Sequence, residues 1–89
     1  MRSDNPEDLL EFPCHYQFKA IGKAGEDFRR DVVQAIARRV EVPADAVRWQ
    51  DSRKGTYQSV SVILTIYSYV QLTGIYAELK QVADLKMLL

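Results

Sequence analysis

Alternating apolar and polar side chains predict two long β-strands in this chain. Residues 14–21 place Tyr16, Phe18 and Ala20 on one face. Residues 57–67 show the clearest alternation, and their apolar face consists of Val60, Val62, Leu64 and Ile66. The opposite face of that strand carries Tyr57, Ser59, Ser61, Ile63, Thr65 and Tyr67. We therefore expect each strand to bury one face and to present the other to solvent or to a partner.

Two further strands complete the pattern. Residues 47–53 form the second strand, with Val47 and Trp49 expected to point inward, and Lys54-Gly55 makes the turn that follows it. Residues 83–89 form the last strand. Its alternation predicts these inward side chains: Leu85, Met87 and Leu89. The side chain of Leu88 is then expected on the outer face.

Helical spacing separates these strands twice. After the first strand, an apolar stripe of helical period consists of Phe28, Val32, Ala35, Ile36 and Val40. The stripe of the second helix consists of Leu72, Ile75, Tyr76, Leu79 and Val82. Ser68 and Gln71 have the spacing of a capping box, in which a hydroxyl and an amide side chain satisfy the first helical turn. The second helix is therefore expected to begin at Ser68.

The order of these elements is β-α-β-β-α-β, which predicts the α+β class and a ferredoxin-like fold. Right-handed crossovers then place both helices on one face of a four-stranded antiparallel sheet with strand order 4-1-3-2. A length of 89 residues suits one domain, which we place at residues 9–89, after a flexible N-terminal tail at residues 1–8. The sheet face without helices is where we expect function.

Composition narrows the classes of function. Twelve basic and twelve acidic residues give a net charge of zero, whereas proteins that bind nucleic acid backbones usually carry a basic excess. The single cysteine, Cys14, cannot form an intramolecular disulfide. No apolar run reaches the ~20 residues of a membrane span, and no signal-peptide core is present. The sequence therefore predicts a cytoplasmic protein without membrane association.

Candidate catalytic and metal-binding groups do not converge. Cys14 and His15 are neighbours on a strand and therefore point to opposite faces, and no other cysteine or histidine completes a zinc site. The hydroxyl row at Ser59, Ser61 and Thr65 has no third group that would orient His15 as a base. We therefore expect no catalytic residues, no metal and no cofactor, in a protein that is not an enzyme.

Several segments resemble a known family. They are residues 9–13 (Leu-Leu-Glu-Phe-Pro), residues 52–63 around Lys54-Gly55 and Tyr57-Gln58-Ser59, and residues 76–79 together with Met87. These segments resemble the YbeD-like family of small bacterial proteins. The resemblance implies a ferredoxin-like fold similar to that of ACT domains, which sense small molecules and regulate amino-acid enzymes. It supplies no catalytic residues, and a likeness of fold is a weak argument for function.

The predicted open face favours a binding function. Aromatic and aliphatic side chains project from it between polar ones, a mixture that is typical of protein interfaces. The candidate interaction surface comprises Lys19, Ile21, Arg53, Lys54, Tyr57, Ser59, Ser61, Ile63 and Tyr67. The sequence therefore predicts a small regulatory or adaptor module that acts through protein contacts, as a homodimer or with an unidentified protein partner.

Two alternatives stay open. By analogy with ACT domains, the loop at residues 22–25 could hold a small molecule, although Glu26 and Asp27 would repel an anion there. RNA-recognition motifs share the predicted topology and stack bases on aromatic side chains of the central strands. In those motifs an aromatic residue follows the basic-glycine pair, whereas here Thr56 follows Lys54-Gly55. That departure and the zero net charge weigh against nucleic acid.

Overall fold

The computed structural model of the chain describes residues 10–89, so the tail predicted at residues 1–8 lies outside the described part. The strands are β1 (Cys14–Lys23), β2 (Val47–Asp51), β3 (Tyr57–Ile66) and β4 (Leu85–Leu88). The helices are α2 (Glu26–Ala37) and α3 (Tyr69–Leu79), and a short 3-10 turn, η1 (Ala44–Ala46), precedes β2. The predicted order β-α-β-β-α-β is confirmed.

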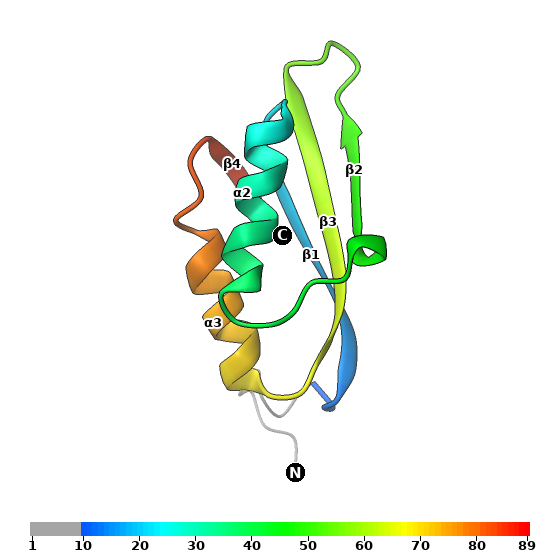
Figure 1. Ribbon diagram of the computed structural model, residues 1–89, viewed down its shortest axis with the longest axis vertical. Helices are drawn as coiled ribbons and strands as arrows, with labels where there is room; N and C mark the ends of the chain where they lie inside the picture. Colours follow the sequence, from blue (N-terminus) through cyan, green and yellow to red (C-terminus); the bar gives the residue numbers. More distant parts are fainter. Residues whose placement is uncertain (1–9) are drawn as a thin grey trace.

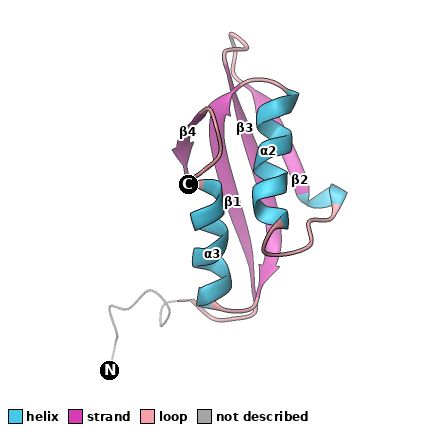
Figure 2. Cartoon of the chain, turned by 60° about the vertical axis from the view of Figure 1, so that its left-hand side comes forward, coloured by secondary structure: helices cyan, strands magenta, loops and turns pink. Residues whose placement is uncertain are grey.

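The four strands form one antiparallel sheet in the order β2-β3-β1-β4, as the sequence predicts (Figure 1). Both helices lie against the same face of this sheet, which leaves the other face open (Figure 2). The strands β1 and β3 occupy the centre, and β2 and β4 form the edges. This is the ferredoxin-like arrangement.

The core lies between the sheet and the helices. β1 and β3 pair over ten residues, from Cys14 opposite Ile66 to Lys23 opposite Tyr57. Their helix-facing side chains are buried, and they are Phe18, Ala20, Val60, Val62, Leu64 and Ile66. The helices contribute Phe28, Val32, Ala35, Ile36, Leu72, Ile75 and Leu79. The alternation predicted for the two central strands is therefore confirmed.

The last strand departs from the predicted alternation. The register between β1 and β4 shifts between Ile21 and Gly22, so Met87 lies opposite Ile21 and Leu88 lies opposite Ala20. Directly opposite residues share a face of the sheet, so Leu88 packs against the core and Met87 lies on the open face, 52% exposed. The predicted inward positions of Met87 and Leu89 and the outward position of Leu88 are therefore wrong, because an irregularity of one residue reverses the alternation; Leu89 is 56% exposed and exchanges backbone hydrogen bonds with Lys19.

Trp49 is on the predicted side of the sheet, but it is not buried. It lies opposite Val60 on the helix-bearing face and is 54% exposed, because β2 is an edge strand. The Arg29 guanidinium covers the indole at 4.1 Å from the ring centroid, which is a cation–π contact. The prediction that Trp49 points into the core is therefore wrong.

Two local interactions hold α3 and the end of the chain. The Ser68 hydroxyl accepts a hydrogen bond from the Gln71 amide N–H at 3.1 Å, and Gln71 Oε1 accepts one from the Tyr67 N–H at 2.8 Å. The predicted helix start is confirmed. Further along, the Tyr76 hydroxyl contacts that of Tyr16 at 2.8 Å and donates to the Leu89 carbonyl at 3.3 Å. Burial, with the Tyr16 hydrogen bond, raises the pKa of Tyr76 well above its ordinary value, so the phenol keeps its proton.

Neighbouring residues of β3 give a direct test of its two faces. Ile63 is 47% exposed on the open face, whereas Leu64 is 6% exposed in the core. We expect Ile63→Glu to lower the free energy of unfolding by about 1 kcal/mol or less. Leu64→Ala should lower it by about 2–5 kcal/mol, because it leaves a cavity. Urea unfolding of both variants measures the difference, and equal losses would contradict the assignment of the two faces.

Alanine substitutions at two glycines are expected to change the stability of the fold in opposite directions. A Cβ added at Gly22 would collide with the Phe28 ring and would lie 2.6 Å from the Asp84 carbonyl oxygen, so Gly22→Ala should destabilise the fold by about 1–3 kcal/mol. At Gly74, inside α3, the nearest atom is in the flexible Arg39 side chain at 3.2 Å. Gly74→Ala should therefore stabilise the fold by up to about 1 kcal/mol. Thermal and urea unfolding compare the two variants, and a stabilising Gly22→Ala would refute this packing.

Candidate functional site

The open face of the sheet is arranged in rows that cross the strands. In the central row, Arg48 of β2 and Lys19 of β1 both lie opposite Ser61 of β3, one on each side. Neighbouring strands lie about 4.8 Å apart, so the Cα atoms of the two cationic residues are about 10 Å apart. A shallow hollow of about 260 Å³ lies here, and its lining includes Lys19, Arg48, Ser59 and Ser61. Two long cationic side chains can therefore reach one group placed over Ser61.

A second hollow, of about 360 Å³, adjoins the first towards the β2–β3 hairpin. From the predicted surface it collects Lys19, Ile21, Arg53, Tyr57 and Ser59. Asp51 also lines it, but Asp51 Oδ1 accepts a hydrogen bond from Gln58 Nε2 at 2.8 Å. Gln58 is only 2% exposed, and its Oε1 has no hydrogen-bond partner among the described residues. Lys54 is exposed in the turn, where Gly55 adopts a φ of 72°.

The remaining predicted residues do not join these hollows. Ile63 lies one row beyond Ser61, opposite Gln17. Tyr67 follows the end of β3 and is 66% exposed. Because a strand rises about 3.3 Å per residue, Tyr57 and Tyr67 lie about 33 Å apart along β3. The structure therefore gathers the predicted surface around Lys19 and Ser59 and leaves Tyr67 at the opposite end.

Two residues outside the predicted surface belong to this face. Arg48 lies in the middle of β2, opposite Ser61. Met87 adds a thioether beside Ile21. Alternation along β2 was enough to place Arg48 on the open face. No sequence signal placed Met87 there, because the register irregularity between β1 and β4 reverses its direction.

Charge is sorted between the two faces of the sheet. At the paired strand positions of residues 10–89, the open face holds Lys19, Lys23 and Arg48 and no aspartate or glutamate. The ion pairs found in this range lie around the helices instead. They join Arg29 to Glu26, Arg30 to Asp27 and Asp31, and Arg38 and Arg39 to Glu78. A chain with no net charge therefore presents a basic sheet face.

The chemistry of single groups on this face is limited. The Thr65 hydroxyl lies 3.2 Å from His15 Nδ1, and no carboxylate in the described part of the chain is hydrogen-bonded to that imidazole. Residues 10–89 contain no cluster of three or more histidine, cysteine or acidic side chains that could hold a metal ion. Neither α2 nor α3, the helices of the described range, is long and apolar enough to cross a membrane.

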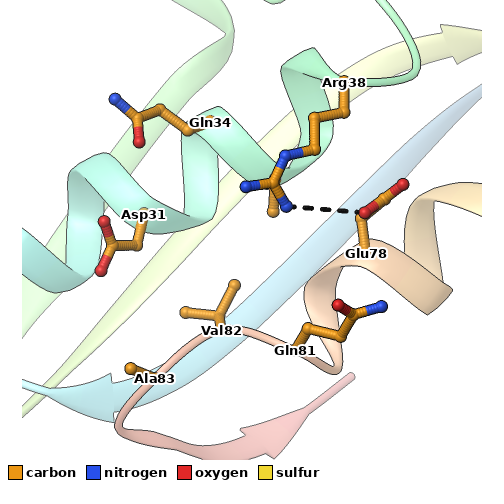
Figure 3. A pocket seen from close by; sticks show the side chains of 8 residues that line it. Asp31, Gln34, Arg38, Glu78, Gln81, Val82 and Ala83 are labelled. Carbon is orange, nitrogen blue, oxygen red and sulfur yellow. Dashed lines mark ion pairs between the residues drawn. The ribbon is translucent and has the colours of Figure 1, made fainter.

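Other hollows lie on the helix side of the sheet. Between α2 and α3, a hollow of about 150 Å³ contains the pair Arg38–Glu78, at 3.6 Å (Figure 3). Arg39 also bonds Glu78 at 2.9 Å, so that carboxylate is already neutralised. The hollow at the β1–α2 loop holds Glu26, Asp27 and Asp84 against Lys23. A broader groove of about 590 Å³ between α2 and β2 includes Val33 and Trp49.

Comparisons with known proteins place the chain in a family. A family model described as "Protein of unknown function (DUF493)" matches residues 7–89. A UPF0250 protein of Ectopseudomonas mendocina is 37% identical over 89 residues, covering 98% of this chain and 97% of the relative. A UPF0250 protein of Haemophilus ducreyi is 42% identical over 84 residues, covering 93% of this chain and 84% of the relative.

The fold also has a solved counterpart. The solution structure of protein HP0495 from H. pylori matches with a TM-score of 0.70 and 14% identity, covering 100% of this chain and 94% of that one. At that identity the likeness concerns the fold alone. The resemblance to YbeD-like proteins read from residues 9–13, 52–63 and 76–79 is confirmed by the sequence relatives. The chain belongs to this family of small bacterial proteins, the DUF493 or UPF0250 family.

Proposed function

We propose that the chain is a non-enzymatic binding module that contacts a protein partner through the open face of its sheet. The observation that carries this proposal is the exposure of large apolar side chains on a face without helices. Tyr57, Ile63 and Met87 are 45%, 47% and 52% exposed there, among hydroxyl and cationic groups. Apolar and aromatic groups set among polar ones are the composition of a protein interface.

Two other ligand classes fit this face less well. A single-stranded nucleic acid stacks its bases on aromatic side chains of the central strands. Here Tyr57 and Tyr67 stand at opposite ends of β3, and Ser59, Ser61 and Thr65 occupy open-face positions between them. A small metabolite is usually bound in a concave pocket that covers most of its surface. The hollows around Lys19 are shallow, and the acidic residues at the β1–α2 loop disfavour anionic metabolites there.

Self-association is a second form of the same proposal. A homodimer that joined two open faces would bring the Lys19 and Arg48 charges of both copies into one interface. Because like charges that lose their water repel strongly, this arrangement opposes the contact made by Ile63 and Met87. We therefore favour an unlike protein partner over a face-to-face homodimer.

Affinity capture from the cells that produce the chain tests this proposal. The wild-type protein, Ile63→Glu and Val70→Glu are immobilised in parallel, and retained proteins are quantified by mass spectrometry after nuclease treatment. Val70 is 80% exposed on α3. Val70→Glu is therefore the matched control, because this substitution adds the same negative charge away from the open face. We expect proteins that bind the wild type and Val70→Glu but fall at least about tenfold with Ile63→Glu.

Two results would count against the open face as a protein-binding surface. One is retention of the same proteins by Ile63→Glu, and the other is retention of nothing specific by the wild type. Light scattering of the free chain at high micromolar concentration measures its molar mass and so tests separately whether the chain forms a homodimer. A dimer that Ile63→Glu dissociates would restore the predicted self-association, whereas a monomer supports an unlike partner.

A further inference from the structure

We infer that the partner is acidic, and that it places a carboxylate over Ser61 between Lys19 and Arg48. This inference rests on the proposed protein-binding function and adds the chemistry of the partner. It depends on three observations. The cations of this face form no ion pair within residues 10–89, they lie on either side of one hydroxyl, and apolar side chains flank them.

Within residues 10–89, the cations of the open face lack the acidic partners that the arginines of α2 and of the turn after it have. Arg29, Arg30, Arg38 and Arg39 each form an ion pair with an acidic residue. Within residues 10–89, neither Lys19 nor Arg48 lies within ion-pair distance of a carboxylate. The nearest positions on the same face hold serine, glutamine and isoleucine, together with Leu89 opposite Lys19. Their charges are therefore available to a partner.

The geometry of the central row suits a single carboxylate. Lys19 of β1 and Arg48 of β2 line the hollow from opposite sides, and Ser61 lines it from β3, between them. An ammonium, a guanidinium and a hydroxyl are all donors, and a carboxylate has two oxygens that accept several hydrogen bonds. One carboxylate can therefore bridge both cations. Asp51, at the margin of the neighbouring hollow, does not compete, because it lies opposite Gln58 on the other face and accepts its amide.

Apolar side chains flank this row along the strands. Ile63 lies two residues from Ser61 in one direction, and the row of Ser59, with Ile21 and Met87, lies two residues away in the other. Two residues of a strand span about 7 Å. An extended segment that lies along the strands has the same spacing between alternate side chains. The matching pattern is an apolar residue, any residue, an acidic residue, any residue and an apolar residue.

A random peptide library provides the test, because no partner needs to be known. The probe is a phage-displayed library of random 12-residue peptides, selected on the immobilised full chain. We expect the enriched peptides to contain aspartate or glutamate with apolar residues two positions away on both sides. An enriched peptide should lose affinity about tenfold or more with Arg48→Glu and about fivefold with Lys19→Gln. Its affinity should also fall as NaCl rises from about 0.05 M to about 0.5 M.

Controls separate this effect from misfolding and from net charge. Lys80 is exposed at the end of α3, so Lys80→Glu and Lys80→Gln change the charge of the chain equally, away from the open face. Both should keep the affinity within about twofold. Backbone amide shifts of the isotope-labelled chain should change in β1 and β3 on binding of the peptide. Circular dichroism of each variant confirms that it is folded.

Several results would overturn the inference. Two concern the selection, which could enrich peptides without acidic residues or enrich no peptides. The others are acidic peptides that bind Arg48→Glu as tightly as the wild type, and amide shifts that are confined to Val33 and Trp49. Tighter binding of a short single-stranded RNA than of any peptide would assign the cations to phosphate instead. If cellular proteins are lost with Ile63→Glu but not with Arg48→Glu, the proposed binding function stands and the acidic partner is wrong.

Discussion

The pairing of β1 with β3 is the constraint on which the rest of the structure depends. Their register runs without interruption from Cys14 opposite Ile66 to Lys23 opposite Tyr57. Because side chains alternate along a strand, this register decides at once which residues enter the core and which form the open face. A slip of one residue would carry Val60 and Val62 into solvent and would bury Ser59 and Ser61. Core and candidate site are therefore set by one interaction and cannot shift independently.

The sequence was sufficient to predict whatever follows from regular alternation or helical period. The central strands, both helices and the strand order come from such patterns, and so does the hydroxyl row of β3. The wrong predictions concern side chains whose direction or burial depends on the neighbouring strand. Met87 reaches the open face because the β1–β4 register shifts at Ile21, a feature that depends on pairing and not on β4 alone. Trp49 stays half exposed because no strand of residues 10–89 pairs with the outer edge of β2, and burial of an indole needs neighbours on both sides.

The charge pattern of the candidate site was hidden for a different reason. A net charge of zero is a sum over the whole chain, and it says nothing about how charges are distributed over the fold. Glu78 forms ion pairs with both Arg38 and Arg39 across the α2–α3 contact, between residues about 40 positions apart in sequence. Such pairs are formed only when the helices pack side by side. The basic character of the open face comes from the positions of Lys19, Lys23 and Arg48 in the sheet, which no sum over the chain reveals.

The position of Lys19 bears on why this face is basic. Charged residues on edge strands prevent a sheet from pairing with another sheet, and this accounts for Arg48 on β2. It does not account for Lys19, because both edges of β1 are already paired, with β3 and β4. Lysine is also less favourable in a strand than a β-branched residue, so folding alone does not select it there. A cation in the middle of an open face opposes contact between two copies and favours contact with an acidic surface. Lys19 therefore supports the proposal of an unlike partner in two ways, because it disfavours self-association and attracts acidic groups.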